Sequence, residues 1–418
     1  MIFPIQDYKE KIMMKKIKKV VFILLILSPT LSFGESSVFA LVPKSIGEHH
    51  YPYSVAALGR GGFSMAVVDS VSLNQMNYSL WTYIPKTTFT LGVAYQGLAT
   101  ESSSNKISSL DGSFLGGFLA IPIMKKKMAI GFGIQPKSIN NQGFVLREAG
   151  VGAKATQTIR SKGTLSEVQF VAAYSPIPDL SLGFFAYYIL GKINDNTTIN
   201  YLDVSYADIV VQNEYHFYGK GPSFGLSGFL RLTPRMTIGA RVKIPTKMTV
   251  YSQQKSITAE KTVEKYQDVT FPLNLTLGMA WQPFERFVIG GDVDYIDWKT
   301  GYLFNGLPLS YMNNSYRIGA GIEIKPSTRR LASYTNRMNY RAGVFYGQMN
   351  FLANGQPINE YGLTAGLGFP IIQGTSRVDV ALQAGKRGDI AINGLSEIFF
   401  RLNFSVSASE LWFVRDDR

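Results

Sequence analysis

From about residue 87 to the end of the chain, apolar side chains alternate with polar or small ones in segments separated by turns. In one such segment, Met236, Ile238 and Val242 alternate with Thr237 and Arg241. Similar segments begin near residues 88, 128, 273, 316 and 398. Successive side chains of a β-strand point to opposite faces, so each segment has one apolar face and one polar face. The pattern predicts an all-β protein with antiparallel strands.

The length and the polar face of these segments distinguish a membrane barrel from a soluble sandwich. The segments run to about 11 residues, which is the length that a tilted strand needs to cross a bilayer. Their polar face carries isolated charges, which are tolerable beside a wet lumen but costly against lipid. We therefore predict a transmembrane antiparallel β-barrel of about 14 strands over residues 87–408, followed by a periplasmic C-terminal tail at 409–418.

Short and long connections alternate between the predicted strands. Short turns are expected at Lys125-Lys126, Pro176-Ile177-Pro178, Thr233-Pro234, Pro283-Phe284-Glu285, roughly Pro326–Arg337, and Pro370–Thr375. Longer polar stretches lie near 99–112, 138–163, 193–219, 245–267, 300–313, 351–359 and 388–395. Short periplasmic turns that alternate with long external loops are typical of an outer-membrane barrel.

The composition agrees with this prediction and excludes other classes. After the first forty residues, no apolar run reaches the roughly 18 residues of a spanning helix. The 40 glycines, 23 tyrosines and 27 phenylalanines suit twisted strands with aromatic girdles. The absence of cysteine suits a chain that folds in the periplasm. The net charge of +13 is scattered along the chain, which favours contact with anionic lipid headgroups or anionic substrates over nucleic-acid binding.

The first forty residues have the pattern of a secretory signal. Four lysines precede the apolar run Val20–Leu27, which is too short for a membrane anchor. Small residues suit cleavage after Gly34 or after Ala40, and the tandem Met13-Met14 indicates that translation can start there. We assign residues 1–40 to a signal peptide, with an uncleaved amphipathic anchor as the alternative.

Residues 41–86 differ in their pattern of apolar and polar residues from the signal peptide and from the predicted strands. They are too irregular for a lipid-facing strand and too apolar for a tail in water, so we expect a plug inside the barrel. The run Gly59-Arg60-Gly61-Gly62 lacks the Lys-Ser/Thr ending and the preceding strand of a phosphate-binding loop. Glycines that let the backbone pass close to the barrel wall explain this run better.

The segment Ala57–Ala66 with Asp69 resembles the hatch of the long-chain fatty acid transporter (FadL-like) family of outer-membrane proteins. The family pattern reads small-Leu-Gly-x-Gly-Gly-x-x-x-Ala followed by Asp, and its Asn-Pro-Ala triplet is replaced here by Asn74–Tyr78. The resemblance implies a fourteen-stranded barrel with a hatch, outer loops that collect a hydrophobic ligand, and lateral release into the membrane. The hatch residues to which it points are Leu58, Gly59, Arg60, Gly61, Gly62, Asp69 and Asn74.

The end of the chain also resembles relatives of the Bacteroidota type. The matching segments are Glu360–Pro370, Val378–Gly388, and the closing strand with its tail, Glu397–Phe413. The likeness therefore covers most of the chain in architecture.

Charged residues on the polar face are candidates for the lumen of the barrel. They are Arg241, Lys243, Asp292, Asp294, Arg317, Glu323, Arg341, Arg377, Asp379, Glu397 and Arg401. A fatty-acid carboxylate needs a cation, which the inward arginines or Arg60 of the hatch could supply. We favour the alternative that these charges form ion pairs that hold hatch and wall together.

The family resemblance also places a lateral opening at an inward kink of the third strand. Gly131, Gly133 and Pro136 could bend this strand, because proline removes a hydrogen-bond donor and glycine weakens pairing. Glycine that faces a crowded lumen explains the first two residues equally well.

No catalytic arrangement is visible in the sequence. The three histidines His49, His50 and His216 show no metal-ligand spacing and no histidine/serine/acid arrangement. We expect no enzyme activity, no cofactor and no metal.

These observations favour an outer-membrane channel for passive uptake of hydrophobic molecules such as long-chain fatty acids. The alternatives are an open porin for small polar solutes and a non-transport barrel that anchors a secretion or surface partner. The expected partners are outer-membrane lipid and lipopolysaccharide, a hydrophobic small-molecule ligand, and the barrel-assembly machinery during biogenesis. We expect no nucleic acid as a partner and a monomeric barrel in the cell outer membrane.

Overall fold

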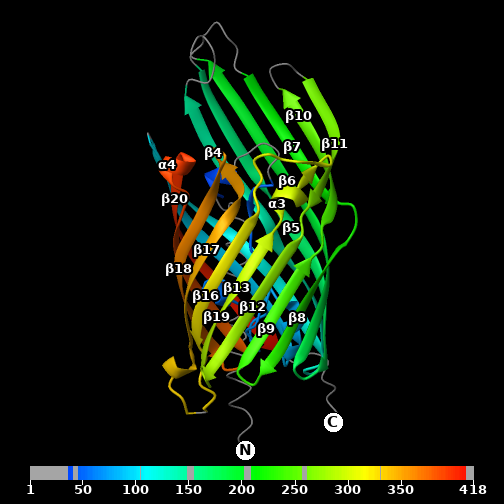
Figure 1. Ribbon diagram of the computed structural model, residues 1–418, viewed down its shortest axis with the longest axis vertical. Coiled ribbons are helices and arrows are strands. Elements are labelled where there is room, and N and C mark those ends of the chain that lie inside the picture. Colours follow the sequence, from blue (N-terminus) through cyan, green and yellow to red (C-terminus); the bar gives the residue numbers. More distant parts are fainter. Residues whose placement is uncertain are drawn as a thin grey trace, which may run out of the picture.

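The strands of this protein form one closed antiparallel barrel (Figure 1). The computed structural model describes residues 36–40, 46–103, 105–147, 155–201, 209–256, 261–329 and 331–410. The last strand, β20 (Leu395–Glu410), pairs with the first barrel strand, β2 (Thr87–Ser102), along the full length of both. The predicted all-β barrel of fourteen strands is confirmed. Most of the predicted signal peptide (up to residue 35) and of the predicted tail (from residue 411) lies outside the described residues.

Three of the fourteen barrel strands consist of two consecutive pieces. These are β7 and β8, β9 and β10, and β11 and β12. Pro222, Pro245 and Pro272 stand at the three breaks, where proline has no N–H to donate to the sheet. The other elements are η2 (Val38–Ala40), β1 (Glu48–His49), α2 (Val55–Leu58), η3 (Tyr78–Tyr83), β3 (Lys106–Met124), β4 (Met128–Arg147), β5 (Ala155–Ile177), β6 (Leu180–Tyr201), β7 (Ile209–Gly219), β8 (Ser223–Thr233), β9 (Met236–Lys243), β10 (Thr246–Ser256), β11 (Lys261–Phe271), β12 (Asn274–Phe284), β13 (Phe287–Ile296), α3 (Trp298–Gly301), β14 (Leu303–Phe304), β15 (Leu307–Pro308), β16 (Ser315–Ile324), η4 (Thr335–Arg337), β17 (Asn339–Ala353), β18 (Gln356–Ile372), β19 (Ser376–Arg387) and α4 (Ile390–Asn393).

The outward face of the barrel is apolar in its lower part. On β6, Leu182, Phe184 and Leu190 point outward and are exposed, while Ser181 and Phe185 point inward and are buried. This apolar band covers about 11 residues of the strand, as expected for a tilted strand in a bilayer. Beyond Leu190, the outward positions of β6 are polar, as expected for a part of a strand that stands above a membrane.

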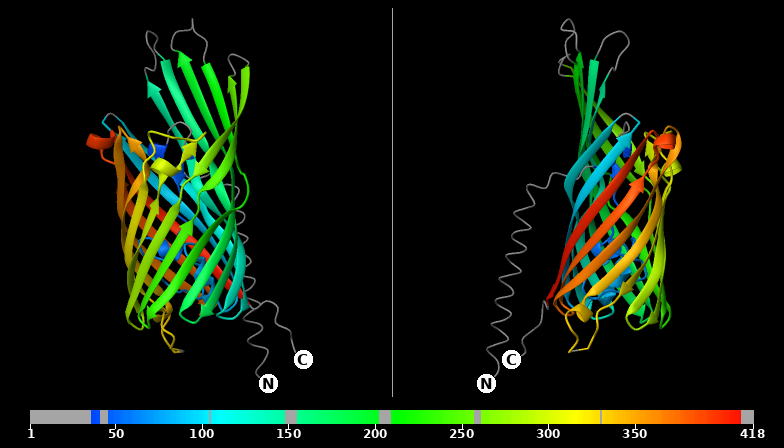
Figure 2. Two further views of the ribbon diagram at one scale, coloured as in Figure 1. Left: turned by 45° about the vertical axis from the view of Figure 1, so that its right-hand side comes forward. Right: turned by 90° about the vertical axis from the view of Figure 1, so that its left-hand side faces the viewer.

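Strands on one side of the barrel rise far above the rim on the other side (Figures 1 and 2). This tall wall consists of the upper parts of β4, β5, β6 and β7, together with β10 and β11. Our prediction of long external loops near 138–163, 193–219 and 245–267 is therefore wrong for most of these residues. In water both faces of a strand can be polar, so the apolar alternation disappears while the backbone hydrogen bonds between strands remain.

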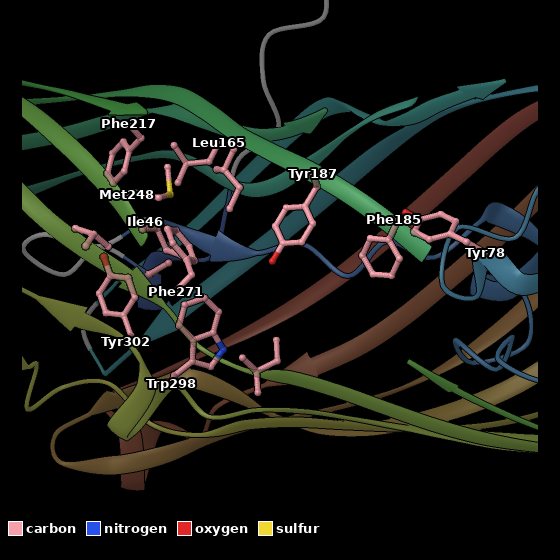
Figure 3. Close-up of a cluster of buried hydrophobic side chains, with 14 of the residues drawn as sticks. Ile46, Tyr78, Leu165, Phe185, Tyr187, Phe217, Met248, Phe271, Trp298 and Tyr302 are labelled. Carbon is pink, nitrogen blue, oxygen red and sulfur yellow. The ribbon is translucent and has the colours of Figure 1, made fainter. Parts of the chain in front are cut away.

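The segment before β2 lies inside the barrel, and its described part from residue 46 contains the two-residue strand β1 and the short helices α2 and η3 (Figure 2). In the part of the chain that is described, no helix is long and apolar enough to cross a membrane. The segment packs against a large cluster of buried apolar side chains on the tall-wall side of the lumen, part of which Figure 3 shows. The labelled members are Ile46, Tyr78, Leu165, Phe185, Tyr187, Phe217, Met248, Phe271, Trp298 and Tyr302.

Candidate functional site

The glycine run of the hatch lies directly on the barrel wall. Ser54 caps α2 by accepting a hydrogen bond from the Ala57 N–H, and the chain then turns through Gly59–Gly62. Gly61 has a φ of +74°, and a Cβ there would collide with the carbonyl oxygens of Val344 and Ala320. Only glycine fits such a close approach with a positive φ. The structure thus agrees with the explanation that these glycines let the backbone pass close to the barrel wall. Leu58 beside the run is buried.

Arg60 and Asp69 join the hatch to one side of the wall through a buried network of ion pairs. Arg60 pairs with Glu323 of β16, and Arg377 of β19 donates to Asp69 at 2.5 Å. Arg341 of β17 connects the two pairs, because it donates to Glu323 at 2.8 Å and to Asp379 at 2.7 Å, and Asp379 also accepts from Arg377 at 2.9 Å. Three arginines thus face three carboxylates, and the network is balanced in charge.

A second balanced network lies higher in the lumen. Arg317 donates to Glu360 at 2.5 Å, and Arg387 donates to the same carboxylate at 2.6 Å. Arg387 also reaches Glu48 of the N-terminal segment at 2.9 Å and Glu397 at 3.4 Å. Arg401 lies 3.3 Å from Glu48. Again three arginines face three carboxylates.

The remaining predicted lumen charges also have partners, on more distant strands of the wall or on the hatch. Arg241 lies 3.6 Å from Asp294, and Lys243 donates to Glu167 at 2.6 Å. Asp292 accepts hydrogen bonds from the backbone N–H groups of Ser64 and Met65 at 2.7 and 2.8 Å, which fixes the hatch to β13. Every charge predicted for the lumen is buried or half-buried there, and none of the predicted arginines lacks a carboxylate within 4 Å among the described residues.

Five charged members of these networks were not singled out from the sequence. They are Glu48, Lys137, Glu167, Glu360 and Arg387. Glu48 lies in the irregular N-terminal segment, and Lys137 and Glu167 lie next to the stretch that we expected to be a loop. Extending the inward alternation past the predicted strand ends would have found Glu167, Glu360 and Arg387.

On the opposite side, the hatch packs through aromatic side chains. Tyr78 and Trp81 of η3 are buried against Phe118 and Phe185 of the wall, with ring centroids 4.9–6.3 Å apart. The turn before η3 is organised by Asn74, whose side-chain oxygen accepts from the N–H groups of residues 76 and 77 at 2.9 and 2.8 Å. An Asx turn of this kind fixes the chain direction without proline.

The wall itself is unpaired between the upper parts of β3 and β4, as far as the described residues go. The two strands pair only from Met124–Met128 up to Gly117–Ile134. Above that level β3 pairs with β2, and β4 pairs with β5 and with the short strand β1. We call this interruption the seam. The Asn141 side chain reaches across it and donates to the Asp111 carboxylate at 2.9 Å.

The three residues predicted to bend the third strand lie at and below this seam. Gly131 and Gly133 are in the paired part of β4, where a Cβ would collide with Trp81 of the hatch or with Phe118 of β3. Pro136 stands just above the last β3–β4 pair, next to a bulge in the pairing with β5. Close approach of the hatch thus accounts for Gly131, and close approach of the Phe118 ring accounts for Gly133. Pro136 alone of the three lies where the strands separate.

The N-terminal segment fills the seam. Residues 48–49 of β1 pair with Ile139 and Ser138 of β4, and the His50 N–H donates to the Lys137 carbonyl at 3.0 Å. Above them, the Ser36 N–H donates to the Asn141 carbonyl at 3.1 Å. We call the described residues 36–40 and 46–50 together the strap.

A cavity of about 120 Å³ lies between the strap, the hatch and the wall. Residues from both strands of the seam line it, namely Leu115 of β3 and Ile139 of β4. Its floor and sides carry aromatic and charged groups, among them Tyr53 and Arg317. The cavity therefore extends from the centre of the barrel to the seam.

The titratable groups of hatch and strap are arranged to stay in one charge state. Burial raises the pKa of Asp69, but the adjacent Arg377 guanidinium outweighs it and holds that pKa below its usual value. Burial, with a smaller contribution from Arg401, lowers the pKa of His50 to about 4, so this histidine is neutral at physiological pH. No group of three or more metal-ligating side chains occurs among the described residues.

A closed barrel with an apolar outer band, a hatch fixed inside it and a seam in its wall defines the class of hatch-plugged outer-membrane barrels. The family model BamG matches residues 13–417, and the chain therefore belongs to the BamG family. No curated protein sequence matches the chain.

Solved structures of FadL-like channels share the fold. The toluene transporter TbuX of Ralstonia pickettii superposes with a TM-score of 0.58 at 15% identity, covering 88% of this chain and 100% of its own. The CymD monoaromatic hydrocarbon channel gives 0.56 at 15%, covering 88% and 99%. A Pseudomonas aeruginosa FadL homologue gives 0.54 at 14%, covering 87% and 99%. At these identities the likeness shows the FadL-like fold alone.

Proposed function

We propose that this protein is a channel of the cell outer membrane that takes up small, uncharged hydrophobic molecules by passive diffusion and releases them sideways into the membrane. The observation that carries the proposal is the seam between β3 and β4. A cavity that reaches an unpaired part of the wall gives a molecule a way out that does not require the hatch to leave the barrel.

The charges of the lumen favour an uncharged cargo over a long-chain fatty acid. Both arginine networks are balanced by internal carboxylates, so a fatty-acid carboxylate would have to displace one of them. The cavity of about 120 Å³ is also too small for a long acyl chain. For scale, an apolar cavity of about 150 Å³ holds benzene, so this partly charged cavity is of the order of one small ring. The likeness to the toluene transporter TbuX and to the monoaromatic hydrocarbon channel CymD supports cargo of this size.

We propose the apolar cluster on the tall-wall side as the route to this cavity. Phe217, Met248 and Phe271 belong to it near the outer end, and Ile46 of the strap lies beside them (Figure 3). These side chains are buried against one another, so an apolar molecule would enter by replacing some of their mutual contacts. The adjoining Tyr187 and Phe185 continue the apolar surface toward the hatch.

A disulfide across the seam tests this function directly. The chain has no cysteine, so Asp111→Cys with Asn141→Cys would introduce the only pair. We expect uptake of radiolabelled toluene into outer-membrane vesicles to fall to background when the pair is oxidised and to recover on reduction. The matched control is Thr158→Cys with Thr198→Cys, which joins two strands that already pair in the tall wall. Equal uptake by the oxidised and reduced seam variant would exclude lateral release, and absence of uptake by the parent protein would exclude the function.

The tall wall supports a second candidate, a barrel that anchors a surface or secretion partner. Its strands extend above the membrane with polar side chains, and among the described residues β11 pairs with β14 only through Val269 and Thr270. Isolation of the protein from native outer membrane in mild detergent should then recover a partner in fixed stoichiometry. Shortening the β4–β5 and β6–β7 hairpins should release that partner without affecting barrel assembly. Single-channel recording tests the open porin, which requires steady conductance past the hatch.

A further inference from the structure

We propose that signal peptidase cleaves this chain after Gly34, and that the mature N-terminal segment then serves as the missing strand at the β3–β4 seam. The cleavage assignment is independent of the proposed function. The role of the strap deepens that function and rests on it, because a molecule that leaves through the seam must displace the strap first.

The residues just after Gly34 are integral to the barrel interior. Ser37 and Ala40 are fully buried, and Ser36 and Phe39 are nearly so. The Phe39 ring packs against Gly388, where a Cβ would collide with it. Cleavage after Ala40 would remove all of these contacts from the mature protein and leave an apolar hole in their place.

Glu397 is fully buried, and its carboxylate depends on this segment for its hydrogen-bond donors. Its carboxylate accepts from the Ser37 hydroxyl at 2.7 Å and from the Val38 N–H at 2.8 Å. Without residues 36–40, only the distant Arg387 contact at 3.4 Å would remain among the described residues. A buried carboxylate that loses its hydrogen-bond donors is costly, so the fold requires these residues to be retained.

The same segment completes the hydrogen bonding of β4 where β3 has left it. Besides the Ser36 N–H bond to its carbonyl, Asn141 donates its own N–H to the Ser36 hydroxyl at 2.9 Å. Glu48 accepts from the Ser37 N–H at 2.8 Å and from the Arg387 side chain at 2.9 Å, which ties both ends of the strap together. A strand edge without partners is unfavourable, and the strap covers this one.

The sequence before the cut agrees with this assignment. Ser32-Phe33-Gly34 places small residues at both positions that signal peptidase reads, as an Ala-x-Ala site does. Val38-Phe39-Ala40 has a bulkier residue at the first of these positions. The local sequence pattern and the burial of residues 36–40 therefore both indicate cleavage of the peptide bond after Gly34.

Intact mass and N-terminal sequencing of the protein purified from outer membrane test the cleavage site. We expect the mature chain to start at Glu35. A chain that starts at Leu41, or one that retains the leader, would overturn the proposal.

A second test reports the position of the strap. Ser36→Cys with Asn141→Cys should form a disulfide during export, because these residues exchange two hydrogen bonds. The expected result is that a maleimide reagent labels no thiol in the denatured protein before reduction and two after it. The matched pair Ser36→Cys with Thr335→Cys, at the opposite end of the barrel, should label twice in both states.

The outcomes of the disulfide test separate the strap from the proposed channel. Two free thiols in the Ser36/Asn141 variant would overturn the strap, and a single thiol would show that residue 36 leaves with the leader. A disulfide with no toluene uptake in the parent protein would reject the channel and leave the strap in place. The Asp111/Asn141 variant provides the check that oxidant reaches a thiol at position 141 when Ser36 is unchanged.

Discussion

The two sides of the hatch are fixed to the barrel by different kinds of contact. Toward β16–β19 the contact consists of ion pairs and backbone hydrogen bonds, with Arg60 and Asp69 at its centre. Toward β4–β8 it consists of aromatic packing by Tyr78 and Trp81. The seam lies on the aromatic side, and the strap reaches from it to Arg387 and Glu397 across the lumen. Every strand of the charged side keeps both neighbours.

The difference indicates which side can move. Buried ion pairs need fixed geometry, and removal of one partner leaves an uncompensated charge, so the charged side resists opening. Apolar contacts are not directional and can be exchanged for contacts with an apolar molecule. A hatch held firmly on one side and by exchangeable contacts on the other can remain in the barrel while a molecule passes along its aromatic side.

Removal of a carboxylate from the charged side should have the largest effect. Glu323→Ala leaves Arg60 and Arg341 without their shared partner, and we expect a loss of about 3–5 kcal/mol in unfolding free energy. Urea titration in phospholipid vesicles, read by the gel mobility of folded and unfolded barrel, measures it. Glu264→Ala at an exposed position of β11 is the control. Equal effects for the two variants would contradict the assignment of the hatch anchor.

A methyl group added on the aromatic side should lower the unfolding free energy by less than the loss of Glu323 does. Gly131→Ala places a Cβ against Trp81 and the Leu119 carbonyl, and we expect a loss of about 2 kcal/mol by overpacking. The same titration measures it. The matched control is Gly228→Ala, whose Cβ would point outward with only the Leu182 side chain at 4.0 Å. If Gly131→Ala were as stable as this control, the hatch would not press on β4.

Replacement of an aromatic ring by a smaller one should lower the unfolding free energy by still less. Trp81→Phe removes the 2.8 Å hydrogen bond from the indole N–H to the Asn74 carbonyl and some ring contact, for which we expect about 1 kcal/mol. If the aromatic side is the exchangeable one, this variant should also take up toluene faster than the parent. A slower or unchanged uptake would contradict the comparison.

The smallest effect should be the pH dependence of the Asp69–Arg377 contact. Because the folded-state pKa of Asp69 is lowered, its stabilisation is fully present above the unfolded value of 3.8 and is lost as the pH falls through the folded pKa. The urea midpoint should therefore contain an Asp69 contribution that is constant from neutral pH to about 4 and declines below it. Asp69→Asn should remove that component of the decline. An Asp69 contribution already lost at pH 6 would contradict the ion pair.

The alternation of the strands made the barrel predictable, because each side chain on a strand must face either lipid or lumen. Arg241, Arg317 and Glu323 could be assigned to the lumen for the same reason. The tall wall could not be predicted in this way. Its strands have water on both faces, and backbone pairing leaves no periodic pattern in the sequence.

The pairing of charges could not be predicted either, because it depends on the register between strands. Arg341 of β17 contacts Glu323 of the adjacent strand β16 and also Asp379 of β19, which lies beyond β18. These positions are well separated in the chain. The strap escaped prediction because Glu48 pairs with Ile139, which lies much later in the chain. Glycine and asparagine in the hatch were easier to interpret, since each serves a local turn.

The uneven height of the barrel has a consequence for how molecules arrive. β6 has 22 residues, about 70 Å at roughly 3.3 Å each, and only half of it is needed to cross the bilayer. The remainder rises beyond that length, beside a lower rim at β16–β20 (Figure 2). Diffusion toward the mouth is then shielded on one flank and open on the other. Molecules would reach the mouth mainly from one direction, so the rotation of the protein relative to its neighbours in the membrane would influence how many of them arrive.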